Sequence, residues 1–168
     1  MTARLSRPIG VRRLHKEESV RVEASEEERA AIAEELDLIA LENLTADITL
    51  RPWRREGVRV EGVVRGTLTQ PCSVTLEPVA GTVEEEIDVR LHPEAAPSTA
   101  VDVDPDAPDP PELLESDTVD VGAIALEHFV LGIDPYPRAP GATFEDDGEP
   151  EEEPSPFAAL ADLKKSLN

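Results

Sequence analysis

Two side chains in the middle of the chain have the types needed for thiol chemistry. Cys72 is the only cysteine, and His92 is the closest of the three histidines to it in sequence. An imidazole beside a thiol lowers the thiol pKa and produces a nucleophilic or redox-active thiolate. A Cys72–His92 pair would therefore make a small redox or ligand-binding module. No third residue that would orient the imidazole is apparent, and cysteine is also a common buried apolar residue, which disfavours catalysis.

The motifs that usually mark enzymes and metal sites are missing from the sequence. It contains no glycine-rich phosphate loop, no GxSxG and no HExxH. Asp102, Asp104 and Asp106 have the spacing of a calcium loop but lack its glycine and its distal glutamate. We therefore expect a binding protein rather than an enzyme, with no metal ion and no cofactor.

Cys72 and His92 belong to a stretch, residues 56–92, that predicts the centre of the fold. Along residues 58–69 apolar side chains alternate with polar ones, and residues 83–91 repeat the pattern. A period of two with one apolar face is typical of half-buried antiparallel strands. The stretch therefore predicts a hairpin whose connection carries Pro71 and Cys72. Gly62 and Gly66 lie on the apolar face and predict a bulge, a bend or a close backbone neighbour.

The flanking segments predict further strands and two helices. Residues 5–14 and 20–23 favour short strands, with Pro8 restricted to an edge, and residues 43–53 favour a longer one. Ser25 and Glu28 form a capping box that predicts a helix over residues 26–40. Asp120 is the expected N-cap of a second helix, residues 121–132, whose apolar stripe includes His128, Phe129 and Leu131.

These elements predict an α+β domain over residues 1–144. It would have a mostly antiparallel sheet, bent toward an open barrel by its two glycines, with two packed helices and long acidic loops. Residues 93–116 are rich in proline and acid and predict a loop inside the domain, and residues 145–155 predict a disordered acidic tether. Residues 156–168 predict a short amphipathic helix, either a partner-docking peptide or a cap on its own domain. Its apolar face carries Phe157, Leu160, Leu163 and Leu167.

Charge indicates the kind of partner. The chain has 37 acidic and 16 basic residues and a formal net charge of −21. Such a charge repels DNA and anionic lipid and favours basic partners. The basic residues are nevertheless concentrated in residues 1–16 and in a second cluster within residues 51–65. That cluster is the candidate site for RNA or another partner, and it consists of Arg51, Trp53, Arg54, Arg55, Arg59 and Arg65.

Trp53 lies between arginines, which leaves two interpretations open. In one, its ring stacks on a base or a guanidinium; in the other, it covers the edge of the core. We favour the second interpretation, packing against the core. The amino terminus lacks the apolar segment of a secretory signal, and no apolar run reaches the about 18 residues of a membrane span. Together with the single cysteine, this predicts a cytoplasmic protein that does not enter membranes.

The order of several motifs resembles a known family. They are VRVEGVVRGTLTQPC, SVTLEPVAGTVEEEIDVRL, DTVDVGAIALEHFVLGIDPYPRAPGATF and the terminal PFAALADLKK. Together they resemble the YceD family, the large ribosomal RNA subunit accumulation proteins, in the form found in alphaproteobacteria. The resemblance covers residues from about position 58 to the carboxyl terminus.

The resemblance implies a non-catalytic role in the accumulation of 23S rRNA and in ribosome assembly. The expected partner is then large-subunit rRNA or a basic large-subunit ribosomal protein. Many relatives carry a CxRC-like pair at the central turn, of which only Cys72 is present here, with Thr75 at the second position. Such a pair suggests a metal or redox role, but one thiolate does not build a tetrahedral zinc site, so this departure from the family pattern argues against zinc in this chain. Two mechanisms remain open. In one, the acidic segments shield a basic ribosomal protein, which accounts for the net negative charge. In the other, the arginines contact rRNA and the acidic tail limits indiscriminate binding of RNA.

Overall fold

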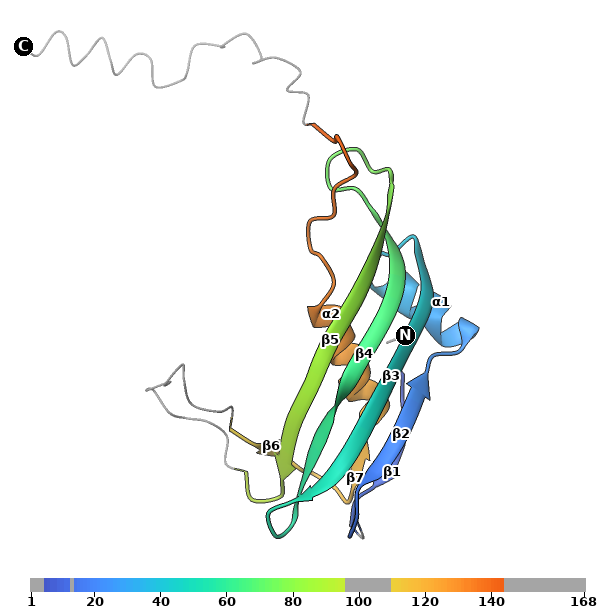
Figure 1. Ribbon diagram of the computed structural model, residues 1–168. Coiled ribbons are helices and arrows are strands. Elements are labelled where there is room, and N and C mark those ends of the chain that lie inside the picture. Colours follow the sequence, from blue (N-terminus) through green and yellow to red (C-terminus); the bar gives the residue numbers. More distant parts are fainter. Residues whose placement is uncertain (1–4, 13, 96–109, 144–168) are drawn as a thin grey trace, which may run out of the picture.

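Three long strands form the centre of the molecule, and the other elements pack on or beside them (Figure 1). The computed structural model describes residues 5–12, 14–95 and 110–143. In chain order the elements are β1 (Pro8–Gly10), β2 (Glu18–Glu23), α1 (Glu26–Glu35), β3 (Ala40–Trp53), β4 (Gly57–Pro71), β5 (Pro78–His92), β6 (Glu112–Leu113), β7 (Thr118–Asp120) and α2 (Val121–Leu131).

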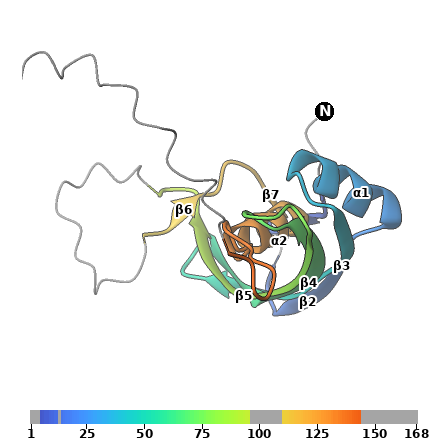
Figure 2. The same cartoon turned by 90° about the horizontal axis from the view of Figure 1, so that it is seen from above.

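The main sheet has the strand order β2-β3-β4-β5-β6, and β1 pairs with β7 in a separate two-stranded sheet. All neighbouring strands are antiparallel except β5 and β6, which are parallel. Seen from above, the sheet curls around α2 and stays open (Figure 2). The predicted α+β fold with a curled, mostly antiparallel sheet is therefore confirmed.

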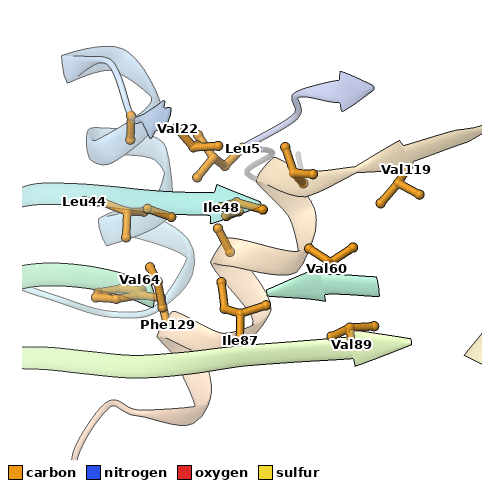
Figure 3. Packing of buried hydrophobic residues seen from close by; sticks show 14 of the residues in the cluster. Leu5, Val22, Leu44, Ile48, Val60, Val64, Ile87, Val89, Val119 and Phe129 are labelled. Atoms are coloured by element: carbon orange, nitrogen blue, oxygen red, sulfur yellow. The ribbon is translucent and has the colours of Figure 1, made fainter. Parts of the chain in front are cut away.

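The central hairpin has the predicted faces. On β4 the apolar residues Val58, Val60, Val64 and Leu68 are all buried. The matching residues of β5 are buried too, and the side chain of Phe129 from α2 lies beside Val64, with its ring over Gly66 of β4 (Figure 3). Phe129 is fully buried, so the concave face of the sheet and one side of α2 form a single apolar core.

The two glycines of β4 allow close approach rather than forming a bulge. A Cβ at Gly62 would collide with the backbone of Asp47 on β3, and one at Gly66 would collide with the ring of Phe129. The one irregularity between β3 and β4 lies instead at Leu41 and Asn43. Of the three alternatives, a close neighbour is the reason for both glycines.

Helix α1 begins as predicted and ends earlier. The Ser25 side chain accepts from the Glu28 amide, and the Glu28 carboxylate accepts from the Ser25 amide. The helix ends at Glu35, so the prediction that it continues to residue 40 is wrong. Asp37 takes a left-handed conformation (φ 53°), and the Leu38 amide donates to Ala33 O at 2.9 Å. This is a Schellman ending built without glycine, which is why the sequence carries no signal for it.

The segment preceding β2 is mostly irregular. Within the predicted strand of residues 5–14 only Pro8–Gly10 forms β1, which pairs with β7. Leu5 is buried in the core, and the backbone N–H of Arg7 donates to the Asp120 carboxylate at 2.7 Å. That carboxylate also accepts from Gly122 and Ala123 and is the N-cap of α2, as predicted. A short ladder to β7, the buried Leu5 side chain and the Asp120 carboxylate thus hold this segment in place.

Two further expectations are wrong in detail. Leu131 was assigned to the apolar stripe of α2, yet it is 76% exposed, because the helix ends there and Gly132 is its C-cap. The predicted loop of residues 93–116 contains β6, whose two residues pair with Leu91 and His92. Two strand residues beside prolines are too short a run for periodicity to reveal.

Candidate partner-binding surface

The six predicted binding residues all lie on the β3–β4 hairpin and divide into two groups. Arg51 on β3 is the cross-strand partner of Arg59 on β4, and Arg65 lies further along β4. These three extend from the convex face of the sheet, because their neighbours in sequence are the buried core residues. Trp53, Arg54 and Arg55 lie at the turn.

Arginine and acid side chains pair with each other over the convex face. The Arg59 guanidinium donates two hydrogen bonds to the Asp88 carboxylate of β5, at 2.8 and 2.9 Å. It also lies 3.2 Å from Glu61, whose other oxygen is 3.5 Å from Arg51. These hydrogen bonds from Arg59, followed by its charge, lower the pKa of Asp88 against the opposing effect of burial. Three strands are thus linked across their outer face.

The other two arginines of this face have acidic partners as well. Arg51 is 2.9 Å from Glu17, and Arg65 lies 3.1 Å from Glu84 of β5 and 3.6 Å from Asp47 of β3. Exposed pairs of this kind contribute little to stability. They matter for binding, since a phosphate would have to compete with a neighbouring carboxylate at each of these arginines.

The turn has a different environment. The Arg54 guanidinium lies 4.2 Å from the centroid of the Trp53 ring, and the His92 ring contacts the same tryptophan edge-on at 6.1 Å. Trp53 is partly exposed and lies at the end of the sheet, outside the buried core. Within the described part of the chain, neither Arg54 nor Arg55 has a carboxylate at ion-pair distance. The stacking partner of Trp53 is therefore a guanidinium.

A cleft of about 540 Å³ lies beside this turn and brings the two basic clusters of the sequence together. Arg12 and His15 line it from the N-terminal segment, and Arg54 and Arg55 line it from the turn. Three acids, Glu56, Glu115 and Asp117, line the same cleft, and Asp117 pairs with Arg12 at 3.1 Å. The cleft therefore has mixed charge.

Cys72 is buried at the opposite end of the hairpin. Its sulfur accepts hydrogen bonds from three backbone amides, those of Ala139 at 3.3 Å and of Val74 and Thr75 at 3.4 Å. The Ala139 amide, and then the Thr75 side chain and the remaining amides, lower the pKa of the thiol to about 6. The cysteine thus holds the β4–β5 connection and the segment after α2 together.

The predicted pair of Cys72 and His92 is wrong. His92 ends β5 beside the β3–β4 turn, where Leu91 pairs with Val58, whereas Cys72 follows Pro71 at the other end of β4. Fourteen strand residues at about 3.3 Å each separate these ends by about 45 Å. A redox or ligand site that uses both side chains is therefore excluded by the register.

The remaining sequence-based candidates are a metal site, the position of Thr75 and the C-terminal docking segment. No group of three potential metal-ligating side chains occurs in the described ranges. Thr75, the position of the second cysteine expected from the resemblance, donates its amide to the Cys72 sulfur. The docking residues Phe157, Leu160 and Leu163, and the acidic tether before them, lie outside the described residues.

The sequence reasoning missed the outer side of β5. Four of the large apolar side chains that are exposed belong to β6, to the end of α2 and to the segment after it: Leu113, Val130, Leu131 and Tyr136. The sequence alone does not show which apolar side chains remain exposed, because exposure depends on the fold. The charge run at residues 84–86 is, however, visible in the sequence next to an apolar strand pattern.

No helix of the described residues is long and apolar enough to cross a membrane.

The comparisons with known proteins place the chain in a family. No curated protein and no solved structure matches the chain. A family model, described as large ribosomal RNA subunit accumulation protein YceD, matches residues 60–164, which is more than half of the sequence. The match includes most of β4, all of β5 and α2, and the chain therefore belongs to the YceD family of large ribosomal RNA subunit accumulation proteins.

Proposed function

We propose that this chain supports accumulation of large-subunit rRNA by holding a basic large-subunit ribosomal protein before that protein is incorporated. In this role the chain is a non-catalytic binding protein of the cytoplasm, and its acidic surface takes the place that the rRNA later occupies. Membership of the family supports the link to large-subunit rRNA, and the charge of the chain supports a basic partner.

The observation that carries this proposal is the pairing of the arginines on the convex face. Arg51, Arg59 and Arg65 each have at least one acidic partner within 3.1 Å. A phosphate backbone would compete with those acids for the arginines and would lie beside the carboxylates. A lysine- or arginine-rich segment has the opposite effect, because it adds positive charge beside a net charge of −21.

The test is a pull-down of the tagged full chain from cell lysate at moderate salt, with and without RNase. The expected result is a basic large-subunit ribosomal protein that stays bound after RNase treatment. Recovery of rRNA that RNase abolishes, with no ribosomal protein left, would overturn the proposal. Recovery of neither component would also overturn it.

A second function, direct contact with rRNA, is favoured by one observation at the turn. Arg54 stacks on Trp53 and, like Arg55, has no acidic partner among the described residues. Guanidinium and indole at an exposed hairpin end are groups that bind phosphate and stack on bases. Arg54→Glu combined with Arg55→Glu would abolish this contact and spare the binding of a basic protein. Arg138→Glu, an exposed site away from the turn, is the control for a charge reversal elsewhere on the surface.

A further inference from the structure

Most of the outer edge of β5 is not paired with another strand. Its inner edge pairs with β4 from Pro78 to Leu91. On the outer side, β6 pairs only with Leu91 and His92, at one end of the strand. No other strand of the described residues lies against that edge, and Figure 1 shows β5 at the rim of the long three-stranded region. A row of backbone donors and acceptors is therefore left without a strand partner.

The residues whose backbone faces this edge can be identified. His92 faces outward, because its carbonyl accepts from the Leu114 amide at 3.1 Å. Glu77 faces β4, because its carbonyl accepts from the Cys72 amide at 2.8 Å. The register between them has no irregularity, so backbone direction alternates and even-numbered residues face outward. Pro78, which has no N–H, occupies one of these outward positions.

The two faces beside the edge differ in character. The even-numbered residues Glu84, Glu86 and Asp88 have their side chains on the convex face, directly at the edge. Glu84 and Asp88 pair with arginines of β4, whereas Glu86 has no cationic partner in the described ranges. On the concave side the end of α2 lies against Val83 and Glu85, since a Cβ at Gly132 would meet both side chains. The residues just before it, Val130 and Leu131, are exposed. The edge therefore has a row of acids on one face, and on the other the exposed apolar side chains of α2 beside Glu85.

From these observations we propose that the outer edge of β5 binds an extended basic segment of a protein partner as an added strand. The segment alternates lysine or arginine with apolar residues. A basic side chain then meets Glu86, which has no cationic partner among the described residues, while the apolar side chains meet Val130 and Leu131. Backbone hydrogen bonds to the even-numbered residues supply affinity that does not depend on one sequence. This inference rests on the proposed function and specifies where and in what conformation the basic partner is held.

A second copy of the chain is the wrong occupant for this edge. Antiparallel pairing of two β5 edges about Glu86 places Glu84 of one copy opposite Asp88 of the other. Like charges directly opposite each other destabilise a strand pair. Charge complementarity therefore selects a basic strand.

Amide hydrogen exchange of the full chain tests the proposal. The probe is a synthetic peptide of alternating valine and lysine, and its control has the same sequence with N-methylated backbone at every second residue. We expect the valine–lysine peptide to slow exchange at Thr82, Glu84, Glu86 and Asp88 by about tenfold or more, because those amides gain a partner. The odd-numbered amides, already bonded to β4, change little. Equal protection by the N-methylated peptide, or protection confined to another surface, would overturn the proposal.

Two substitutions at one position separate backbone from charge. Glu86→Gln removes one charge and keeps the N–H, so it should weaken peptide binding only about two- to fivefold. Glu86→Pro also removes the outward N–H without affecting the β4 ladder and should weaken binding by about tenfold or more. Unchanged exchange at the odd-numbered amides shows that the proline variant folds. Equal effects of the two substitutions would contradict strand addition.

The same pair of variants in the pull-down distinguishes this inference from the proposed function. If the wild-type chain retains a ribosomal protein after RNase treatment and the Glu86→Pro variant does not, the result supports both the proposed function and the strand proposal. Retention by wild type and Glu86→Pro alike overturns the strand proposal and leaves the proposed function intact. No retention by the wild-type chain overturns the proposed function, whereas the peptide exchange experiment still decides whether the edge accepts a strand.

Discussion

The guanidinium of Arg7 donates two hydrogen bonds to the Glu28 carboxylate, at 2.8 and 2.9 Å, and so joins the N-terminal segment to the first turn of α1. The same carboxylate accepts from the Ser25 amide in the capping box. Hydrogen bonding by Arg7 is the main cause that lowers the pKa of Glu28 from 4.5 to about 2, against the effect of burial. One side chain therefore caps a helix and fixes a segment that is far from it in sequence.

We predict that Arg7→Met lowers the free energy of unfolding by about 1 to 2 kcal/mol at neutral pH, after allowance for solvent screening. Because the folded chain keeps Glu28 ionised where the unfolded chain begins to bind a proton, this stabilisation is complete above pH 4.5 and is lost as pH falls toward 2. Urea unfolding of both proteins across this pH range measures the difference. Arg12→Met is the control, since the Arg12–Asp117 pair is far more exposed. A difference that persists unchanged at the acid end would contradict this account.

Gly66→Ala should destabilise the fold by about 1 to 3 kcal/mol, because its Cβ collides with the ring of Phe129. Phe129→Leu shortens that side chain, so the double variant should lose less stability than the sum of the two single variants. Gly62→Ala meets the backbone of Asp47 and offers no such rescue. Gly10→Ala, with open space around it, is the control. Thermal or urea unfolding of the five variants checks the prediction, and strict additivity would disprove the contact.

These two sites mark what sequence reasoning can and cannot reach. The capping box of Ser25 and Glu28 and the buried face of β4 follow from local pattern, because spacing alone determines which side chains share a face or a turn. The contact of Gly66 with Phe129 joins residues far apart in sequence, and the glycine itself indicates only that something lies close. The failed Cys72–His92 pair has a different cause. The predicted hairpin, with Cys72 in its connection, already places the outer ends of its two arms far from that connection.

Asp37→Gly should raise the free energy of unfolding by about 0.5 to 1 kcal/mol. Asp37 adopts φ 53° at the end of α1, a conformation that glycine takes without strain. The substitution also removes a negative charge from the C-terminal end of the helix dipole. Asp37→Asn separates the two causes, because asparagine tolerates this conformation and lacks the charge. A loss of stability in both variants on urea unfolding would contradict the Schellman geometry.

The ion pairs of the convex face show a similar limit for the site. The sequence identifies Arg51, Arg59 and Arg65 as a basic cluster, because they are close along two neighbouring strands. Their acidic partners Glu17, Glu84 and Asp88 come from other segments, so only the register of the sheet shows that the charge is compensated. Arg54 and Arg55 differ because a turn has fewer neighbouring strands. The positions of the arginines can therefore be read from the sequence, but which of them lack an acidic partner and can bind a ligand cannot.

The Cys72 thiol should react slowly with iodoacetamide in the folded protein although its pKa is lowered to about 6. The sulfur is fully buried, so reagent access rather than thiolate content limits the rate. Comparison with the same chain in urea measures the protection. Rapid alkylation in the folded state would contradict the burial.

The lowered thiol pKa also has a consequence for stability. The unfolded thiol titrates near pH 9 and the folded one near 6, so the unfolded chain binds more protons between these values. Stability contributed by the thiolate is therefore complete above pH 9 and is lost as pH falls through 6. Urea unfolding should show stability that rises with pH over this range in the wild type, and a smaller rise in Cys72→Ala. Identical slopes would show that the amide hydrogen bonds do not favour the thiolate.

Trp53 is the only tryptophan of the chain, so its fluorescence reports on the turn without labelling. If the protein holds a basic partner and leaves rRNA alone, a fragment of large-subunit rRNA should not change Trp53 emission at about 0.15 M salt. The physical reason is that the turn offers only Arg54 and Arg55 as cations without acidic partners in the described ranges, while Arg51 and Arg59 nearby are paired. Quenching that saturates with RNA, weakens with added salt and disappears in Arg54→Glu with Arg55→Glu would contradict this expectation. If Arg138→Glu kept that quenching, the loss would be assigned to the turn rather than to a charge reversal elsewhere on the surface. The rRNA-contact function would then replace the escort function.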